Sequence, residues 1–324
     1  ERLIEYCSKL DDQDNLKLRM KTLWESLASS WTKVYSNCCK EVRYRYSYLL
    51  REGSYYYDEE RYNTSSFLEF LKNSSWVPSV SGSFCRPDEL FLDTRQNRYL
   101  LGGSRQYVNL PTYPAFIKDI GIRIEPLVDE VINHLKLYRE ENPFPEENQV
   151  EKCSITYTFL KKKLREADDI DPQNTRAEDV KQAFESFELI YIPRKDKCWW
   201  KPSCVFWKDY SKLFGLLCGY LEHAGKEIYS FDIKDFLLML GGSDKPSIQQ
   251  CLDILKELKT ANIEQFKQVA RQAYKYIDDA LGTEGAQKVN WDRPIFLSTE
   301  GEFLVPSELY YNDDEEYMKI FSNK

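Results

Sequence analysis

The residues best suited to chemistry form a basic and aromatic cluster near the N-terminus. Arginine and tyrosine alternate from Arg43 to Tyr46, and further arginines and tyrosines follow, up to Tyr57. Cations interleaved with rings are typical of surfaces that stack the bases of single-stranded nucleic acid. The acidic run 58–60 would repel phosphate, so we favour a helix end whose tyrosines pack against the next element. The alternative, a surface that binds nucleic acid or a protein partner, would use Arg43, Arg45, Arg51, Tyr55 and Tyr56.

Neither histidine, His134 nor His223, belongs to a catalytic or metal-binding motif. Glu130 and His134 are four residues apart on an expected helix, which is typical of a surface pair. The nine cysteines are odd in number and contain no Cys-x-x-Cys, so we expect reduced thiols that mostly fill the core. We therefore expect no metal site and no cofactor.

Other catalytic signatures are missing from the sequence. There is no Gly-x-Ser-x-Gly, and the residues around Gly225-Lys226 fail the phosphate-loop pattern. The acidic runs 168–171 and 313–316 are interpreted as solvated turns. We expect no catalytic residues and no enzyme activity from this chain, although a site assembled from distant residues is a third hypothesis.

Composition limits the class of protein. The chain has 324 residues, a net charge of −8, 42% hydrophobic residues and 15% aromatic residues, which predicts folded cores and helices. An acidic balance disfavours nonspecific binding to nucleic acid or to an anionic membrane. Free thiols, with no apolar run of about 18–20 residues, favour an intracellular protein, cytoplasmic or nuclear. The chain starts at Glu1 without Met, and we expect it to be part of a longer protein.

Two segments match without a gap at a separation of 120 residues. In the first, Phe116 to Ile120 lead to Gly121 and then to Pro126. In the second, Phe236 to Leu240 lead to Gly241 and then to Pro246. The pattern predicts a helix that ends at Ile120 or Leu240, a left-handed glycine cap, and a new helix with proline in its first turn.

A second pattern occurs three times and predicts a β-hairpin that ends at a proline. The three segments are 76–91, 190–206 and 295–310, and their prolines are Pro87, Pro202 and Pro306. Trp76 begins the first segment, and an acid follows the first and third prolines, as Glu89 and Glu308. We expect the hairpin cores to contain Trp76, Phe84, Leu90, Ile192, Trp200, Val205, Phe296, Phe303 and Leu309, with Phe116, Ile120, Phe236 and Leu240 buried beside them.

These elements predict an α+β fold that is predominantly α-helical, with tandem modules that each dock a β-hairpin on helices. Apolar residues spaced by three or four from Leu16 to Val42 predict one long amphipathic lead-in helix. The expected domains are a helical lead-in at 1–72, a first repeat module at 73–185, a second at 186–290 and the start of a third at 291–324. Polar stretches at 63–73, 168–179 and 282–290 are the expected boundaries.

The hairpin segments and the Phe236 to Lys256 stretch resemble repeats of sacsin and of the NO VEIN-type proteins of plants and microbes. The resemblance is carried by the motifs around Trp76 to Phe91 and Gly301 to Asp313. It implies a repeat region downstream of a GHKL-type ATPase-like domain that lies outside this chain. Pro202-Ser203-Cys204-Val205 departs from the pattern because the usual acid is missing. We expect that acid to cap the short turn after the proline.

The resulting hypothesis is a non-catalytic scaffold that supports or relays the ATPase-like domain and binds protein partners or neighbouring domains of its own chain. Stacked modules create long surfaces of this kind. The alternative is a nucleic-acid-contacting module of a microbial defence or DNA-processing protein. The Arg43 to Tyr57 cluster supports that alternative, and the negative net charge weighs against it.

Overall fold

A computed structural model describes residues 13–36, 42–46, 59–111, 113–144, 146, 148–170, 176–215, 217–223, 225–257, 263–284, 296–298 and 302–309. The chain divides into two compact units, Glu1–His134 and Leu135–Lys324. Helices predominate, and each sheet among the described residues has only two short strands. This confirms the predicted fold class, α+β and predominantly α-helical.

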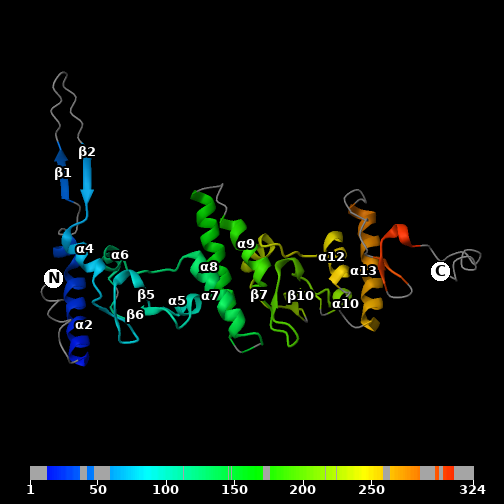
Figure 1. Cartoon of the computed structure of the whole chain (residues 1–324), viewed down its shortest axis with the longest axis horizontal. Coiled ribbons are helices and arrows are strands. Elements are labelled where there is room, and N and C mark those ends of the chain that lie inside the picture. The colour runs from blue at the N-terminus through cyan, green and yellow to red at the C-terminus, as the bar shows by residue number, and fades with distance from the viewer. Residues whose placement is uncertain are drawn as a thin grey trace, which may run out of the picture. The chain divides into compact units, whose positions relative to one another are not determined.

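Unit 1 alternates helices with pairs of short strands (Figure 1). Its helices are α2 (Gln13–Ser30), which continues into a π-helical turn at Trp31–Tyr35, α4 (Ser66–Asn73), α5 (Arg95–Leu101), α6 (Pro114–Ile120) and the start of α7 (Val128–Glu141). Its strands are β1 (Val42–Tyr46), β2 (Glu59–Asn63), β3 (Val77–Pro78), β4 (Phe84–Cys85), β5 (Leu90–Leu92) and β6 (Gln106–Val108). β5 and β6 are parallel, and the other two pairs are antiparallel.

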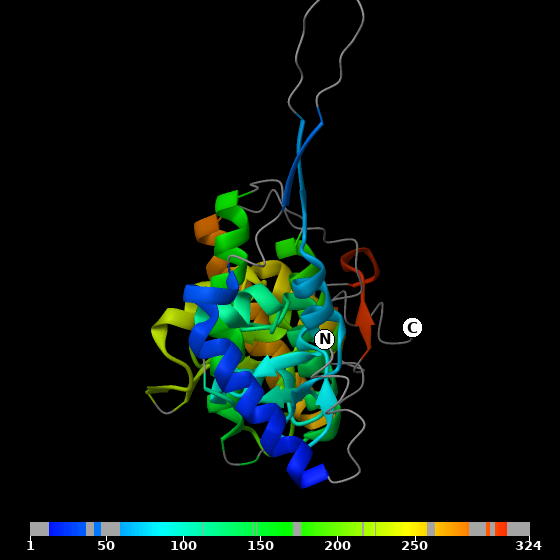
Figure 2. The same ribbon diagram turned by 90° about the vertical axis from the view of Figure 1, so that its left-hand side faces the viewer.

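The core of unit 1 is an aromatic cluster that joins α2 to the hairpin and to α6. The Phe116 ring lies 4.9 Å from Trp24, 4.6 Å from Trp31 and 6.5 Å from Trp76, measured between centroids. The indole N–H of Trp31 donates to Asp119 Oδ2 at 2.8 Å. Figure 2 shows α2 in blue in the foreground. The lead-in helix is therefore part of the core that contains the first hairpin.

One expectation for the N-terminal region is wrong. The lead-in helix does not reach Val42, because that residue begins β1 and pairs with Asn63 of β2. In residues 42–46 valine and tyrosine alternate with arginine, which is the two-residue period of a strand. The helix prediction rested on apolar residues three or four apart and overlooked this alternation. The expected domain boundary at 63–73 contains α4, where the Ser65 hydroxyl accepts from the Leu68 N–H at 3.2 Å. Polar composition concealed a helix that buries only a narrow face.

Unit 2 contains the rest of the elements. Its helices are the end of α7, α8 (Gln149–Ile170), α9 (Arg176–Phe187), α10 (Ser211–Phe214), α11 (Phe231–Met239), α12 (Ile248–Glu257) and α13 (Ile263–Glu284). Its strands are β7 (Ile190–Tyr191), β8 (Trp199–Trp200), β9 (Val205–Phe206), β10 (Gly219–Tyr220), β11 (Glu222–His223), β12 (Lys226–Glu227), β13 (Phe296–Leu297) and β14 (Phe303–Leu304). Part of the expected boundaries at 168–179 and 282–290 is helical, in α8, α9 and α13, and residues 171–175 and 285–290 lie outside the described ranges.

Buried tyrosines organise one core of unit 2. The Tyr157 ring lies 5.9 Å from Phe184, 5.5 Å from Tyr229 and 6.2 Å from Phe236. Its hydroxyl donates to the Leu189 carbonyl at 2.8 Å and accepts from the Tyr191 N–H at 2.9 Å. These bonds attach the start of β7 to α8.

The three predicted hairpins are present as β3–β4, β7–β8 and β13–β14. The expected core residues are mostly buried. Trp76, Leu90, Ile192, Trp200, Val205, Phe303, Phe116, Ile120, Phe236 and Leu240 are buried, whereas Phe84, Phe296 and Leu309 are half-buried.

The glycine turns after α6 and α11 are close to their predicted form. Gly121 caps α6 in the left-handed region with φ 93° and ψ 18°. α11 ends at Met239, one residue earlier than expected, and Gly241 has φ 114°. Positive φ is accessible to glycine because it has no Cβ to clash with the backbone.

Pro126 and Pro246 precede the next helices and do not lie in their first turns. The first carbonyls to accept intrahelical bonds are those of Leu127 and Ser247, so these two residues are the N-caps of α7 and α12. Both prolines are buried just outside the helix. Each helix therefore begins two residues later than predicted, and the proline lies just before the N-cap.

The hydrogen bonds of these two caps match at a separation of 120 residues. The Leu127 N–H donates to Glu130 Oε2 at 3.0 Å, and the Ser247 N–H donates to Gln250 Oε1 at 2.9 Å. Residues 123 and 243 also correspond, because each forms a parallel bridge to a hairpin-following strand, at Phe91 and Phe206. The similarity therefore extends from the sequence to individual hydrogen bonds.

Candidate functional site

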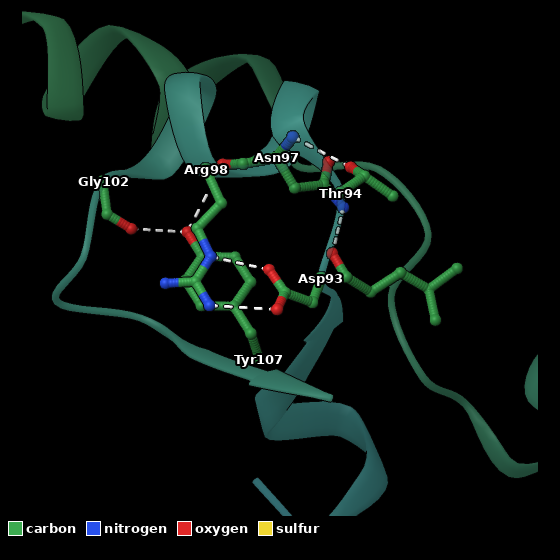
Figure 3. Close-up of polar contacts among 7 residues, drawn as sticks. Asp93, Thr94, Asn97, Arg98, Gly102 and Tyr107 are labelled. Carbon is green, nitrogen blue, oxygen red and sulfur yellow. Dashed lines mark hydrogen bonds and ion pairs between the residues drawn. The ribbon is translucent and has the colours of Figure 1, made fainter. Parts of the chain in front are cut away.

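A polar network surrounds the crossover from β5 through α5 to β6, and Figure 3 shows its side chains. Strand β5 ends at Leu92, and Asp93 and Thr94 follow at the edge where side chains of parallel strands commonly form sites. Thr94 is the N-cap of α5, and its hydroxyl accepts from the Asn97 N–H at 3.0 Å. The start of α5 therefore places Asn97 and Arg98 beside the ends of the two strands.

Arg98 is held by a carboxylate and an aromatic ring. Its Nε and Nη2 donate to the two oxygens of Asp93 at 2.6 and 3.0 Å, and its guanidinium carbon lies 4.4 Å from the Tyr107 ring centroid (Figure 3). The hydrogen bond from Arg98 lowers the pKa of Asp93, and the same bond raises the pKa of Arg98. The pair therefore stays charged near neutral pH.

Asn97 and Tyr107 fasten the crossover to its surroundings. Asn97 is buried, and its Nδ2 donates to the carbonyls of Leu92 and Ile124, both at 2.9 Å. The Tyr107 hydroxyl donates to the Gly102 carbonyl at 2.5 Å. The bonds of Asn97 connect α5 with β5 and with the turn ahead of α7, and the bond of Tyr107 connects β6 with the end of α5.

A second ion pair lies on the other side of β5. Arg123 donates to both carboxylate oxygens of Glu130, and its guanidinium carbon lies 4.4 Å from the Phe91 ring centroid. Burial would raise the pKa of Glu130, but hydrogen bonds from Arg123 and the Leu127 N–H outweigh it and keep the pKa below its ordinary value. The Glu130 side chain is only 18% exposed, so it is more buried than we expected of a surface pair with His134.

The groups of the Asp93 network are poorly tuned for acid–base catalysis at neutral pH. The pKa of Asp93 is lowered, that of Arg98 is raised, and burial raises that of Tyr107. Each shift moves the group away from neutrality, whereas a general acid or base works best with a pKa near the operating pH. The geometry of this network favours a fixed set of charged and aromatic side chains over a catalytic site.

Unit 2 contains a similar crossover from β9 through α10 to β10. The Tyr220 hydroxyl donates to the Gly215 carbonyl at 3.3 Å, with the same five-residue spacing as Tyr107 and Gly102. Both glycines have positive φ, 55° at Gly215 and 72° at Gly102, and both end the short helix. The Gly-x4-Tyr spacing recurs in the sequence at Gly102 and Gly215 but was not among the predicted motifs.

The predicted acid after the hairpin proline does cap a short turn. Glu89 Oε2 accepts from the Arg86 N–H at 3.0 Å, and Glu308 Oε2 accepts from the Val305 N–H at 3.3 Å. Pro87, Pro202 and Pro306 each begin a 3₁₀ turn. The other expected motif residue, Trp76, is fully buried, and its indole N–H donates to the Leu71 carbonyl.

The second turn lacks the acid, and a distant glutamate takes over part of its role. Glu185 of α9 accepts from the Ser203 N–H at 3.2 Å and from the Ser203 hydroxyl. Cys204 occupies the position of the missing acid. Because 18 residues separate Glu185 from Ser203, no local motif could have indicated this contact.

The predicted binding cluster is only partly described. The backbones of Arg43 and Arg45 lie on β1, opposite Tyr62 and Glu60 of β2, so the expected helix end is wrong. Strands β1 and β2 form a ribbon that extends away from the helices of unit 1 (Figures 1 and 2). Arg51, Tyr55 and Tyr56 lie outside the described residues, and the binding role of the cluster stays a prediction.

Two searches for other kinds of site gave negative results. Among the described residues, no group of three or more His, Cys, Asp or Glu side chains is placed to hold a metal ion. In the same ranges, the helices are too short or too polar to cross a membrane.

Comparisons of the chain with protein-family models, with curated proteins and with solved structures found no match. The resemblance to sacsin and NO VEIN-type proteins therefore rests on the hairpin and glycine-turn motifs alone.

Proposed function

We propose that this chain is a non-catalytic scaffold of tandem modules in a larger protein of the sacsin or NO VEIN kind. It supports or relays a GHKL-type ATPase-like domain and binds protein partners or neighbouring domains. The observation that carries the proposal is the recurrence of the cap at Leu127–Glu130 and Ser247–Gln250. Recurrent units of this kind stack into extended binding surfaces.

The crossovers support the same proposal. Tyr107–Gly102 and Tyr220–Gly215 repeat one hydrogen bond in two units whose other side chains differ. Modules that repeat an internal hydrogen bond but differ in their surface residues are expected of a scaffold that binds different partners. The fixed charges of Asp93 and Arg98 suit recognition better than turnover.

The proposal is tested in the longer protein by its ATP turnover. Gly121→Val and Gly241→Val disturb one turn in each unit, and Gly103→Ala, with open space around its Cβ position, is the control. A relay predicts that both valine variants reduce turnover or its response to a partner, while the control does not. Unchanged turnover in both variants would refute the relay, and substrate turnover by the purified chain itself would refute its non-catalytic role.

A second candidate function is contact with nucleic acid. The observation in its favour is that Arg43 and Arg45 lie on an extended two-stranded ribbon, an element that fits the major groove of DNA. A gel-shift titration at low salt would use single- and double-stranded DNA and RNA, with Arg43→Ala/Arg45→Ala as the variant. Lys162→Ala/Arg165→Ala, at two exposed side chains, removes the same charge and is the control. No binding at tens of micromolar would reject this function.

A further inference from the structure

Two buried hydrogen-bond donors at the N-terminus of α8 have no acceptor. Gln149, the first residue of this 22-residue helix, is 1% exposed, and Tyr191 of β7 is 0% exposed. Among the described residues, neither Gln149 Nε2 nor the Tyr191 hydroxyl has a hydrogen-bond partner. A buried polar group without a partner costs about 1–3 kcal/mol, so two such donors beside one helix start are suited to a bound ligand.

The two donors converge on one place. The Glu146 N–H donates to Gln149 Oε1 at 3.1 Å, and the same N–H lies near enough to the Tyr191 hydroxyl to oppose the rise that burial causes in the pKa of that group. This shared neighbour places the Gln149 amide and the Tyr191 hydroxyl at the same turn ahead of α8. The amide hydrogens of Gln149 and the hydroxyl hydrogen of Tyr191 are the parts that still need a partner.

The surroundings favour a negatively charged partner. Three more N–H groups without an intrahelical acceptor occur in the first turn of any helix, where the macrodipole also attracts anions. A water molecule would bring two hydrogens that need acceptors of their own, whereas an oxyanion brings only acceptors.

We propose that the N-terminus of α8 binds a small oxyanion, of the carboxylate or phosphate type, through Gln149 Nε2 and the Tyr191 hydroxyl. The site lies within unit 2 and is independent of the scaffold proposal.

Thermal unfolding of the whole chain in sodium phosphate, sodium acetate and sodium chloride at equal ionic strength tests the site. We expect one of the two oxyanions to raise Tm by about 3 °C over chloride at tenfold excess over its Kd. The effective salt distinguishes a phosphate-type from a carboxylate-type ligand.

The variants assign any effect to the site. Tyr191→Phe and Gln149→Leu each remove one donor and should abolish the rise, while Tyr220→Phe, which removes a hydroxyl already bonded to Gly215, should keep it. An equal Tm in the three salts would overturn the proposal, as would a rise that persists in both donor variants. Tyr191→Phe is nearly isosteric, so it also tests the site if Gln149→Leu fails to fold.

Discussion

The left-handed turn at Gly121 offers the sharpest test of the fold. Gly121 has φ 93°, and a Cβ added there would meet no atom within 4 Å. Alanine at this position therefore costs conformational energy alone. An L-residue in the left-handed region costs roughly 1–2 kcal/mol, and the lower entropy of the unfolded chain offsets only part of that cost. We expect Gly121→Ala to lower the free energy of unfolding by about 1–2 kcal/mol.

Gly103 is the matched control, because its Cβ position is equally open and its φ is not in the left-handed region. Gly103→Ala should leave stability unchanged or raise it by up to about 1 kcal/mol. Gly121→Asn should fall between the two, since asparagine tolerates this region better than alanine does.

Urea unfolding followed by tryptophan fluorescence measures the difference. Trp24, Trp31 and Trp76 are buried in the core of unit 1, and Trp199, Trp200 and Trp207 are buried in unit 2, so the fluorescence follows both transitions. The two units can unfold separately, so far-UV circular dichroism should be recorded in parallel to separate the transitions. Equal midpoints for Gly121→Ala and Gly103→Ala, with unchanged m-values, would refute the assignment of a strained left-handed cap.

Three further predictions concern single side chains. Arg123 holds the pKa of Glu130 below its ordinary value of 4.5, so the pair stabilises unit 1 above that pH and this stabilisation is lost as the pH falls through the lowered pKa. Glu130→Gln should therefore reduce the loss of unfolding free energy between about pH 6 and pH 3, measured by urea titrations at each pH. Glu185→Ala should cost about 1–2 kcal/mol by leaving the Ser203 N–H without its acceptor, measured by the shift of the urea midpoint; a change within about 0.3 kcal/mol would show that the contact is dispensable. Tyr107→Phe should cost about 1 kcal/mol by the same measurement, and no loss would mean that water replaces its hydroxyl.

The sequence was informative where a local rule decides the structure. Gly121 could be predicted as a turn because a glycine after an apolar helix pattern needs little context. The hairpins could be predicted because apolar strands, a polar turn and a proline follow one another directly. Glu89 and Glu308 could be predicted as caps because the acid lies three residues from the N–H that it accepts from.

The sequence was silent where distant residues meet. Glu185 substitutes for an acid that its own turn lacks, and only the packing of α9 on that turn brings the two together. Arg98 and Asp93 are five residues apart across a helix N-terminus, a spacing that no helix or strand period places on one face. The donors at Gln149 and Tyr191 are 42 residues apart, and their lack of an acceptor is a property of burial that no pattern of residue types expresses.

The bonds from α2 to the far end of unit 1 have a consequence for synthesis of the protein. Trp24 and Trp31 donate to Pro111 and Asp119, which follow them by 87 and 88 residues. At about 5–20 residues per second, a ribosome needs roughly 4–18 s to produce that interval. Until α6 emerges, Phe116 is missing from the cluster and the tryptophan face of α2 is only partly covered, so the nascent chain should be most prone to aggregation, and most dependent on chaperones, while the segment between these residues is being translated.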